Sequence, residues 1–272
     1  MQSRNTLPRV SVLALALATP LFAHAAPDDA KDLDKVIVTA TRTPTTVDAA
    51  LAAVEVIDRT QIDASSARSL PELLRGRAGI SIVNQGGLGK LSTLFMRGTE
   101  SDHTLFLIDG VRVGSPTSGL TSLQDIPLEQ IDHIEIVRGP RSSLYGADAI
   151  GGVIQIFTRR DTRTGTHGHA RIAIGSNQFR EASAGVDFRG AQGGVGVDVA
   201  HQSTAGINSC LGYYNPVTWA GAGCFIVPGT HFDRDGYRNN SASVHADFAP
   251  SEAWQLDARA TRATGHNDYD GD

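Results

Sequence analysis

The sequence predicts an α+β domain followed by the first antiparallel strands of a transmembrane β-barrel, which stays incomplete. Three observations predict this class: an export signal at the N-terminus, short strands and helical turns mixed together as far as residue 160, and later segments in which apolar and polar residues alternate. The 272 residues are enough for one or two domains. The formal net charge of −5, without a block of Lys or Arg, argues against a nucleic-acid surface.

Residues 1–25 have the composition of a secretory signal peptide. Two arginines precede the short apolar run VSVLALALAT at 10–19, and small residues allow cleavage after Ala25 or Ala26. A buried helix or a membrane anchor is the alternative, but a spanning helix needs about 20 apolar residues. This run is shorter and Pro20 interrupts it. If the exported protein enters a membrane, it therefore has to cross as a β-barrel.

Residues 26–46 are predicted to be a periplasmic segment. A polar stretch leads into DKVIVTATR at 34–42, whose centre has high β-propensity before Pro44 blocks continuation. Such a short apolar segment is either the first strand of the following domain or a peptide that adds a strand to the sheet edge of a partner. The residues alone leave both interpretations open.

Residues 47–160 are predicted to form the α+β domain. Strands are expected at 54–58, 80–83, 93–97, 104–108, 134–137 and 154–158, and helical turns at 127–130 and 142–145. A helix begins at the N-cap Ser69, with Pro71 in its first turn. Two polar loops, NQGGLGK at 84–90 and GSPTSGLTS at 114–122, separate these elements, and the first lacks the spacing of a phosphate-binding loop.

Five alternating segments are predicted within residues 165–272. They lie at 168–175, 181–188, 195–200, 242–248 and 254–261. Strands of outer-membrane barrels alternate in this way, with apolar residues toward lipid and polar residues toward the lumen. A soluble antiparallel sheet with one wet face is the alternative. The export signal and the preceding domain favour the barrel.

The long loop predicted from Ile207 to Asn240 contains both cysteines of the chain. Cys210 and Cys224 lie close together in an exported protein, which indicates a disulfide. A loop of about 15 residues closed in this way would gain roughly 3 kcal/mol of stability. The loop ends in Asp233-Arg234-Asp235-Gly236, which resembles part of a calcium loop, and Asp268 and Asp270 could add oxygen ligands. A solvated acidic turn is the alternative.

Four stretches resemble the TonB-dependent outer-membrane receptors, and within that family the branch that transports cobalamin (vitamin B12). They are DKVIVTATR at 34–42, NQGGLGKLSTLFMRGT at 84–99, LIDGVR at 107–112 and IVRGPRSSLYGADAIGGVIQI at 136–156. The resemblance implies energy-dependent cobalamin uptake across the outer membrane of a Gram-negative bacterium, with a plug domain at 47–160. It also implies that the TonB energy-coupling protein pairs with a TonB box made of Asp34, Lys35, Val36, Ile37, Val38, Thr39 and Ala40.

The same resemblance implies substrate contacts in the two polar loops. Those contacts are Gln85, Leu91 and Ser92 in the first loop and Ser115, Thr117 and Ser118 in the second. Lys90 stands where the resemblance implies a neutral amide residue. Outer-loop aspartates bind calcium in the cobalamin branch, which would give that role to Asp233, Asp235, Asp268 and Asp270.

No enzymatic activity is expected, since the sequence has no H-E-x-x-H, no G-x-S-x-G and no paired-cysteine metal motif. A receptor for a ferric siderophore or another chelate is the alternative within the class. A non-transporting exported module for binding or signalling is the alternative outside it. Barrels of the family have about 22 strands, and the residues after 160 are enough for about five. The chain is therefore expected to be an N-terminal fragment.

Overall fold

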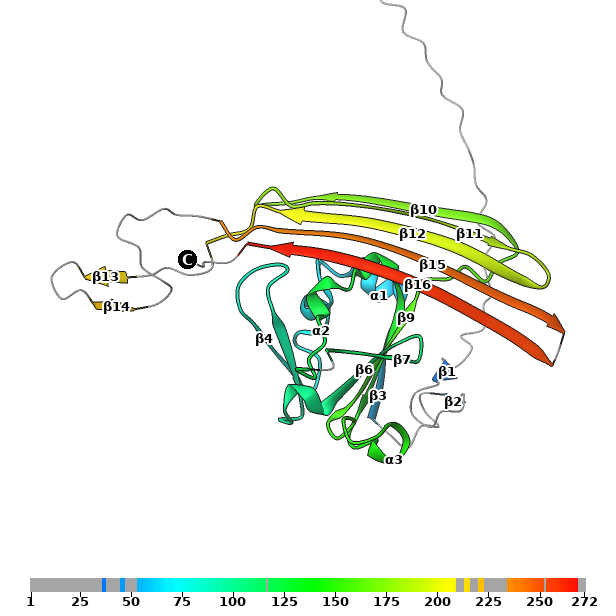
Figure 1. Ribbon diagram of the computed structural model, residues 1–272, viewed down its shortest axis with the longest axis horizontal. Coiled ribbons are helices and arrows are strands. Elements are labelled where there is room, and N and C mark those ends of the chain that lie inside the picture. The colour runs from blue at the N-terminus through cyan, green and yellow to red at the C-terminus, as the bar shows by residue number, and fades with distance from the viewer. Residues whose placement is uncertain are drawn as a thin grey trace, which may run out of the picture. The chain divides into compact units, whose positions relative to one another are not determined.

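The computed structural model describes residues 53–115, 117–208, 234–251 and 253–268. It also gives the backbone of four short strands, which are β1 (Val36–Ile37), β2 (Thr45–Thr46), β13 (Tyr213–Asn215) and β14 (Ala220–Ala222). Two sheets of five strands each contain most of the remaining strands (Figure 1). No helix within the described ranges is long and apolar enough to cross a membrane.

The first sheet belongs to the predicted α+β domain and has the strand order β3-β8-β9-β6-β7. Its strands are β3 (Ala53–Ile57), β6 (Thr104–Ile108), β7 (Val111–Val113), β8 (Ile131–Arg138) and β9 (Gly152–Thr158). Only the β6–β9 pair is parallel among these four pairings. β4 (Ile80–Asn84) and β5 (Ser92–Met96) form a separate hairpin that carries the first polar loop.

Short helices cover this sheet and connect its strands. They are α1 (Arg59–Ala64), α2 (Leu70–Leu74), α3 (Ser142–Tyr145) and the 3-10 turns η1 (Ser101–His103), η2 (Leu123–Asp125) and η3 (Leu128–Gln130). Ser69 caps α2, as predicted. Helix α1 was not predicted from the sequence, because its six residues bury only Ile62 and so show no apolar periodicity. The signal that could have found it is the capping box formed by Asp58 and Gln61.

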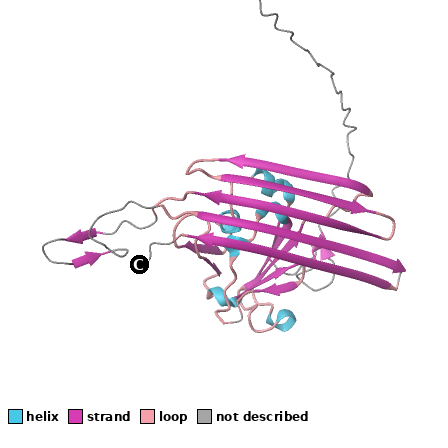
Figure 2. Cartoon of the chain, turned by 45° about the horizontal axis from the view of Figure 1, so that its top comes forward, coloured by secondary structure: helices cyan, strands magenta, loops and turns pink. Residues whose placement is uncertain are grey.

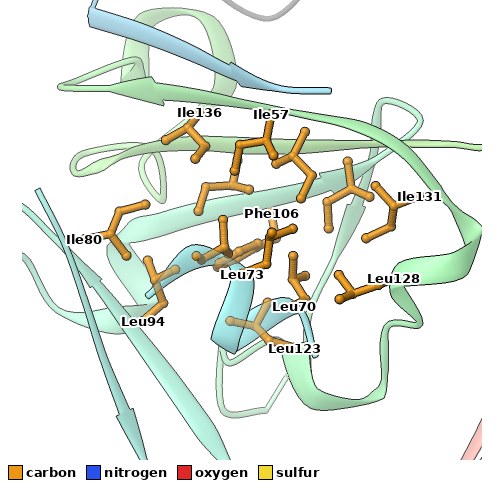
Figure 3. Packing of buried hydrophobic residues seen from close by; sticks show 14 of the residues in the cluster. Ile57, Leu70, Leu73, Ile80, Leu94, Phe106, Leu123, Leu128, Ile131 and Ile136 are labelled. Carbon is orange, nitrogen blue, oxygen red and sulfur yellow. The ribbon is translucent and has the colours of Figure 1, made fainter. Parts of the chain in front are cut away.

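Branched aliphatic side chains from the sheet and from α2 form the core of this domain (Figure 3). Ile57, Leu74 and Ile134 are fully buried there. Gly152, the first residue of β9, allows a close backbone approach to β8: a Cβ there would lie 2.3 Å from the carbonyl oxygen of Val137. A side chain at this position would therefore push β9 away from β8.

The second sheet has the order β10-β11-β12-β15-β16, and all its neighbouring strands are antiparallel (Figure 2). The strands are β10 (Gly165–Ile174), β11 (Arg180–Arg189), β12 (Gly193–Thr204), β15 (Tyr237–Ser251) and β16 (Trp254–Asn267). All five predicted strands are present, and each is longer than predicted. β15 already begins at Tyr237, so the predicted loop 207–240 ends too late. Within that loop β13 pairs with β14, which the sequence analysis missed.

Candidate functional site

The second sheet exposes its apolar face and buries its polar face. Ile172 and Ile174 are 83% and 84% exposed, and the same face carries Val186, Phe188, Val195, Val197, Val199, Val244, Phe248 and Leu256, all exposed. The opposite face buries Ser183, Asp187, Asp198, Ser241, Ser243 and His245. A soluble sheet with one wet face would have the reverse arrangement. The arrangement fits a sheet with lipid on one side and a polar interior on the other. It excludes the alternative of a soluble antiparallel sheet with one wet face.

Contacts between charged and polar side chains cross the polar face from strand to strand. The Nε2 atom of His245 on β15 lies 3.0 Å from Oδ1 of Asp187 on β11, so this pair spans the intervening β12. Arg189 donates two hydrogen bonds, of 2.6 and 3.1 Å, to the carboxylate of Asp247. Because buried charges are costly unless they are paired, these contacts stabilise the buried polar face of the second sheet. We call this face, formed by strands β10, β11, β12, β15 and β16, the polar wall.

Arg171 of β10 connects this wall to the α+β domain. Its Nε lies 3.3 Å from a carboxylate oxygen of Glu129 in η3 and 3.3 Å from one of Glu181 on β11, and its Nη1 lies 3.7 Å from Asp63 of α1. Burial raises the pKa of Glu129, and the Arg171 charge opposes that rise. One guanidinium therefore serves three carboxylates from both parts of the chain.

Two further contacts lie along the same interface. Gln130 Nε2 donates to Ser241 Oγ at 3.2 Å. Near the end of β9, Arg259 of β16 donates to the Asp109 carboxylate and to the Thr158 hydroxyl. The Asp109 carboxylate also accepts from the Thr158 backbone N–H at 3.0 Å, so it binds the end of β9 and the wall together.

The ends of β15 and β16 contact the α+β domain through a set of residues that we call the strand rim: residues 234–239 and 265–268. The Tyr237 hydroxyl donates to the Gln124 carbonyl at 3.1 Å and lies 3.1 Å from Oδ1 of Asp125. Asn239 Nδ2 donates to the Asp125 carbonyl at 3.1 Å. Burial raises the pKa of Asp125, and the hydrogen bond from Tyr237 opposes that rise.

The tip of the β4–β5 hairpin also packs on the strand rim. A Cβ on Gly89, which has a φ of +80°, would lie 2.1 Å from the Tyr237 ring, so only glycine fits there. The adjacent Lys90 is 1% exposed. Its Nζ donates to the Gly236 carbonyl at 3.3 Å and to the Asp268 carbonyl. From the sequence, Lys90 was expected only as a departure from the family pattern in a substrate loop.

A cavity of about 810 Å³ lies between the second polar loop and β16. Its lining combines apolar side chains, such as Val111 and Ile156, with the charged groups Asp109, Arg160 and Arg259. Its volume falls within the range of about 300–1,000 Å³ of small-molecule sites. Ser115 lines this cavity, whereas Thr117 and Ser118 do not.

The predicted substrate residues occupy two separate loop regions. Gln85 is exposed, and its backbone N–H donates to the Leu91 carbonyl at 3.1 Å. Ser92 is buried in the hairpin, where its hydroxyl accepts from Asn84 Nδ2 at 2.8 Å. In the second loop, the Ser115 and Thr117 hydroxyls lie 2.9 Å apart, and Thr117 and Ser118 are exposed.

Several other predicted residues fall outside the described residues. Of the predicted TonB box, Asp34, Lys35, Val38, Thr39 and Ala40 do so, while Val36 and Ile37 form β1, which pairs antiparallel with β2. Cys210, Cys224, Asp233 and Asp270 also lie outside them, as do residues 1–25. Asp235 is buried, and the Asp268 N–H donates to the Gly236 carbonyl at 3.0 Å. Within the described ranges, no group of three or more His, Cys, Asp or Glu residues could hold a metal ion.

Known proteins are similar to this chain in sequence. The family described as TonB-dependent Receptor Plug Domain matches residues 46–153. The vitamin B12 transporter of Vibrio cholerae serotype O1 is 38% identical over 267 residues, which are 96% of this chain and 41% of that protein. The vitamin B12 transporter of Photobacterium profundum is 30% identical over 98% of this chain and 41% of its own length. The chain thus spans about two fifths of the curated relatives that it matches.

Solved structures share the fold at lower sequence identity. The ferric enterobactin receptor of Pseudomonas aeruginosa, in a double-mutant form, aligns with a TM-score of 0.65 and 22% identity over 87% of this chain and 35% of that one. The ferric yersiniabactin uptake receptor of Yersinia pestis aligns with a TM-score of 0.60 and 21% identity over 79% of this chain and 32% of that one. At these identities the likeness concerns the fold alone.

Proposed function

We propose that this chain, which belongs to the TonB-dependent receptor family, provides the plug domain and the first barrel strands of an outer-membrane transporter for cobalamin. The inverted second sheet carries the membrane part of the proposal, because a sheet with an exposed apolar face and a buried polar face has to meet lipid rather than water. The identity of 38% with a vitamin B12 transporter supports cobalamin as the substrate.

In the proposed mechanism the plug does no covalent chemistry. Its residues hold it in place through hydrogen bonds and ion pairs to the polar wall, chiefly at Arg171, at Gln130 and at the strand rim. Cobalamin is a large, amide-rich ligand, and the polar loop tips around Gln85 and Ser115 supply small polar groups to receive it. The cavity beside Ser115 is large enough for one part of such a ligand.

The proposed energy input reaches the plug through the TonB box. The extended backbone of Val36 and Ile37, which pair with β2, supports the proposal that this segment can add as a strand to a sheet edge of the TonB protein. Proline cannot donate the hydrogen bond that such a pairing needs. Val38 therefore offers a test of the coupling that leaves the substrate loops unchanged.

The experiment combines binding and uptake in the product of the complete gene, expressed in a Gram-negative host that lacks its own cobalamin transporter. We expect saturable cyanocobalamin binding, cobalamin-dependent growth, and growth that Val38→Pro abolishes while binding remains. The matched variant Val38→Ala keeps the backbone donor and should sustain growth.

Each other result assigns a different function. Tight binding of a ferric siderophore without cobalamin binding would replace the proposed substrate and favour the siderophore alternative. Ligand binding that never leads to uptake, with or without an intact Val38, would favour an exported binding module. Uptake that survives Val38→Pro would contradict the strand-addition role of this segment.

A further inference from the structure

We propose that the Lys90 ammonium acts as the ordering cation of the strand rim. Its hydrogen bonds hold the start of β15 and the end of β16 at the tip of the β4–β5 hairpin. In this view a plug side chain performs the ordering that a bound divalent ion would otherwise provide. The proposal concerns the order of the rim and does not depend on which substrate is carried.

The ammonium group of Lys90 lies where the two strand ends meet. Lys90 is 1% exposed, although lysine is almost never fully buried unless it is paired. Its Nζ donates to the carbonyl oxygens of Gly236 and Asp268, which lie just before β15 and just after β16. These two carbonyls belong to adjacent strand ends, since the Asp268 N–H itself donates to the Gly236 carbonyl at 3.0 Å. One ammonium thus joins both ends at a single point.

A calcium ion at this place would compete with the Lys90 ammonium for the same backbone carbonyls. Calcium needs about six to eight oxygen ligands, which include backbone carbonyls and carboxylates. Asp268 Oδ1 lies 3.4 Å from His266 Nε2, so this carboxylate already has a side-chain partner. The carbonyls that would complete such a site already accept from Lys90. A divalent ion placed on them would also lie close to the ammonium, and like charges at such separations repel each other.

The tip of the β4–β5 hairpin fits closely against the strand rim. The absence of a side chain at Gly89 lets the Tyr237 ring pack directly on the backbone next to Lys90. Tyr237 in turn contacts Gln124 and Asp125 of the plug. The ammonium is therefore held in a closely packed contact, where a hydrogen bond from a charged donor contributes more than it would in water.

The test is amide hydrogen exchange of the rim in the product of the complete gene, folded in detergent. We expect Lys90→Met to speed exchange at residues 234–237 and 265–268 by between about tenfold and a hundredfold, the range that corresponds to a hydrogen bond from a charged group. Arg112→Met removes a positive charge from an exposed plug side chain and should leave the rim unchanged. Wild-type exchange should be equal in a chelator and in about 1 mM calcium, which is near the weak limit of extracellular calcium sites.

Two results would overturn the proposal. One is unchanged rim exchange in Lys90→Met. The other is wild-type exchange that calcium slows and a chelator speeds, which would make a bound ion the ordering group. The wild-type comparison needs no variant, so it decides the question even if Lys90→Met fails to fold. Loss of cobalamin binding would not affect either outcome, which separates this proposal from the substrate assignment.

Discussion

Glu55 shows at the scale of a single residue how the plug holds its first strand. Burial by itself would raise the pKa of the Glu55 carboxyl, but hydrogen bonds from Arg138 and Arg77 outweigh it and lower the pKa below its ordinary value of 4.5. A lowered folded-state pKa stabilises the fold above the unfolded value, and this contribution is lost as the pH falls through the folded value.

We therefore expect Glu55→Gln to lower the free energy of unfolding at neutral pH, and the deficit relative to wild type to shrink as the pH falls below 4.5. Denaturant unfolding across this pH range measures the deficit. Glu100→Gln, at an exposed position, is the control and should cost little at any pH. A deficit for Glu55→Gln that stays constant with pH would show that its charge does not contribute.

Gly89 allows a second prediction at this scale, because the chain contains a matched control. Gly89 and Gly98 have φ values of +80° and +79°, but a Cβ on Gly98 would meet nothing within 4 Å. Gly98→Ala should therefore cost only the backbone term of about 1–2 kcal/mol. Gly89→Ala should cost about 1–3 kcal/mol more, because its methyl group overlaps the Tyr237 ring. Thermal unfolding measures both losses, and equal losses would contradict the close packing described at the strand rim.

Residue partners in the site could not be predicted from the sequence. The alternating pattern indicated that Arg171 and Glu181 face inward, but Arg171 also contacts Glu129, which is more than forty positions away in the chain. Lys90 was assigned by its place in a loop, and its burial depends on Gly236 and Asp268, which lie 146 and 178 positions further along. Such contacts are fixed by how the sheets meet, which no local pattern encodes.

At the scale of elements, the lipid-facing surface of the second sheet gives the clearest prediction. Val197 lies on the exposed face of β12. In the product of the complete gene, Val197→Arg should lower the stability of insertion into lipid vesicles by about 2–4 kcal/mol, the cost of arginine near the bilayer midplane.

Val111→Arg is the control, because Val111 is the more exposed of the two valines but belongs to the plug. It should insert as well as wild type. Refolding yield and protease protection in vesicles compare the variants. Equal behaviour of the two would mean that the apolar face of β12 does not meet lipid.

Element prediction succeeded where one period dominated the sequence. The five strands of the second sheet alternate apolar and polar residues, and all five were predicted. Their ends were not predicted. In β15, for example, the first residues, Tyr237 to Ser241, show no strong apolar alternation. α1 and β7 were missed because six and three residues are too short to show a period. Asp109 and Gly110 form the tight turn between β6 and β7, and both have the positive φ angles that such a hairpin turn requires.

At the scale of the whole molecule, the alternating strands and the preceding α+β pattern, together with a predicted export signal, indicated the architecture that the structure shows. The sequence alone did not decide whether the apolar face of the second sheet meets lipid or the core of a soluble domain. Alternation of apolar and polar residues fits both arrangements. The burial of Asp187, Asp198 and His245 on the face opposite the exposed apolar side chains decided it. The disulfide between Cys210 and Cys224 and the role of the TonB box stay predictions, since these positions lie largely outside the described residues.

The polar character of the interface between plug and wall has a mechanical consequence. The named contacts across it are hydrogen bonds and ion pairs, such as those of Gln130, Arg171 and Tyr237. Water can replace such bonds one at a time at a small net cost, whereas separating two apolar surfaces exposes all of their area. Water can therefore weaken this interface one contact at a time, and a modest force applied to one end of the plug would meet low resistance. The plug is therefore held firmly at rest, and it can move along the polar wall when a force acts on it.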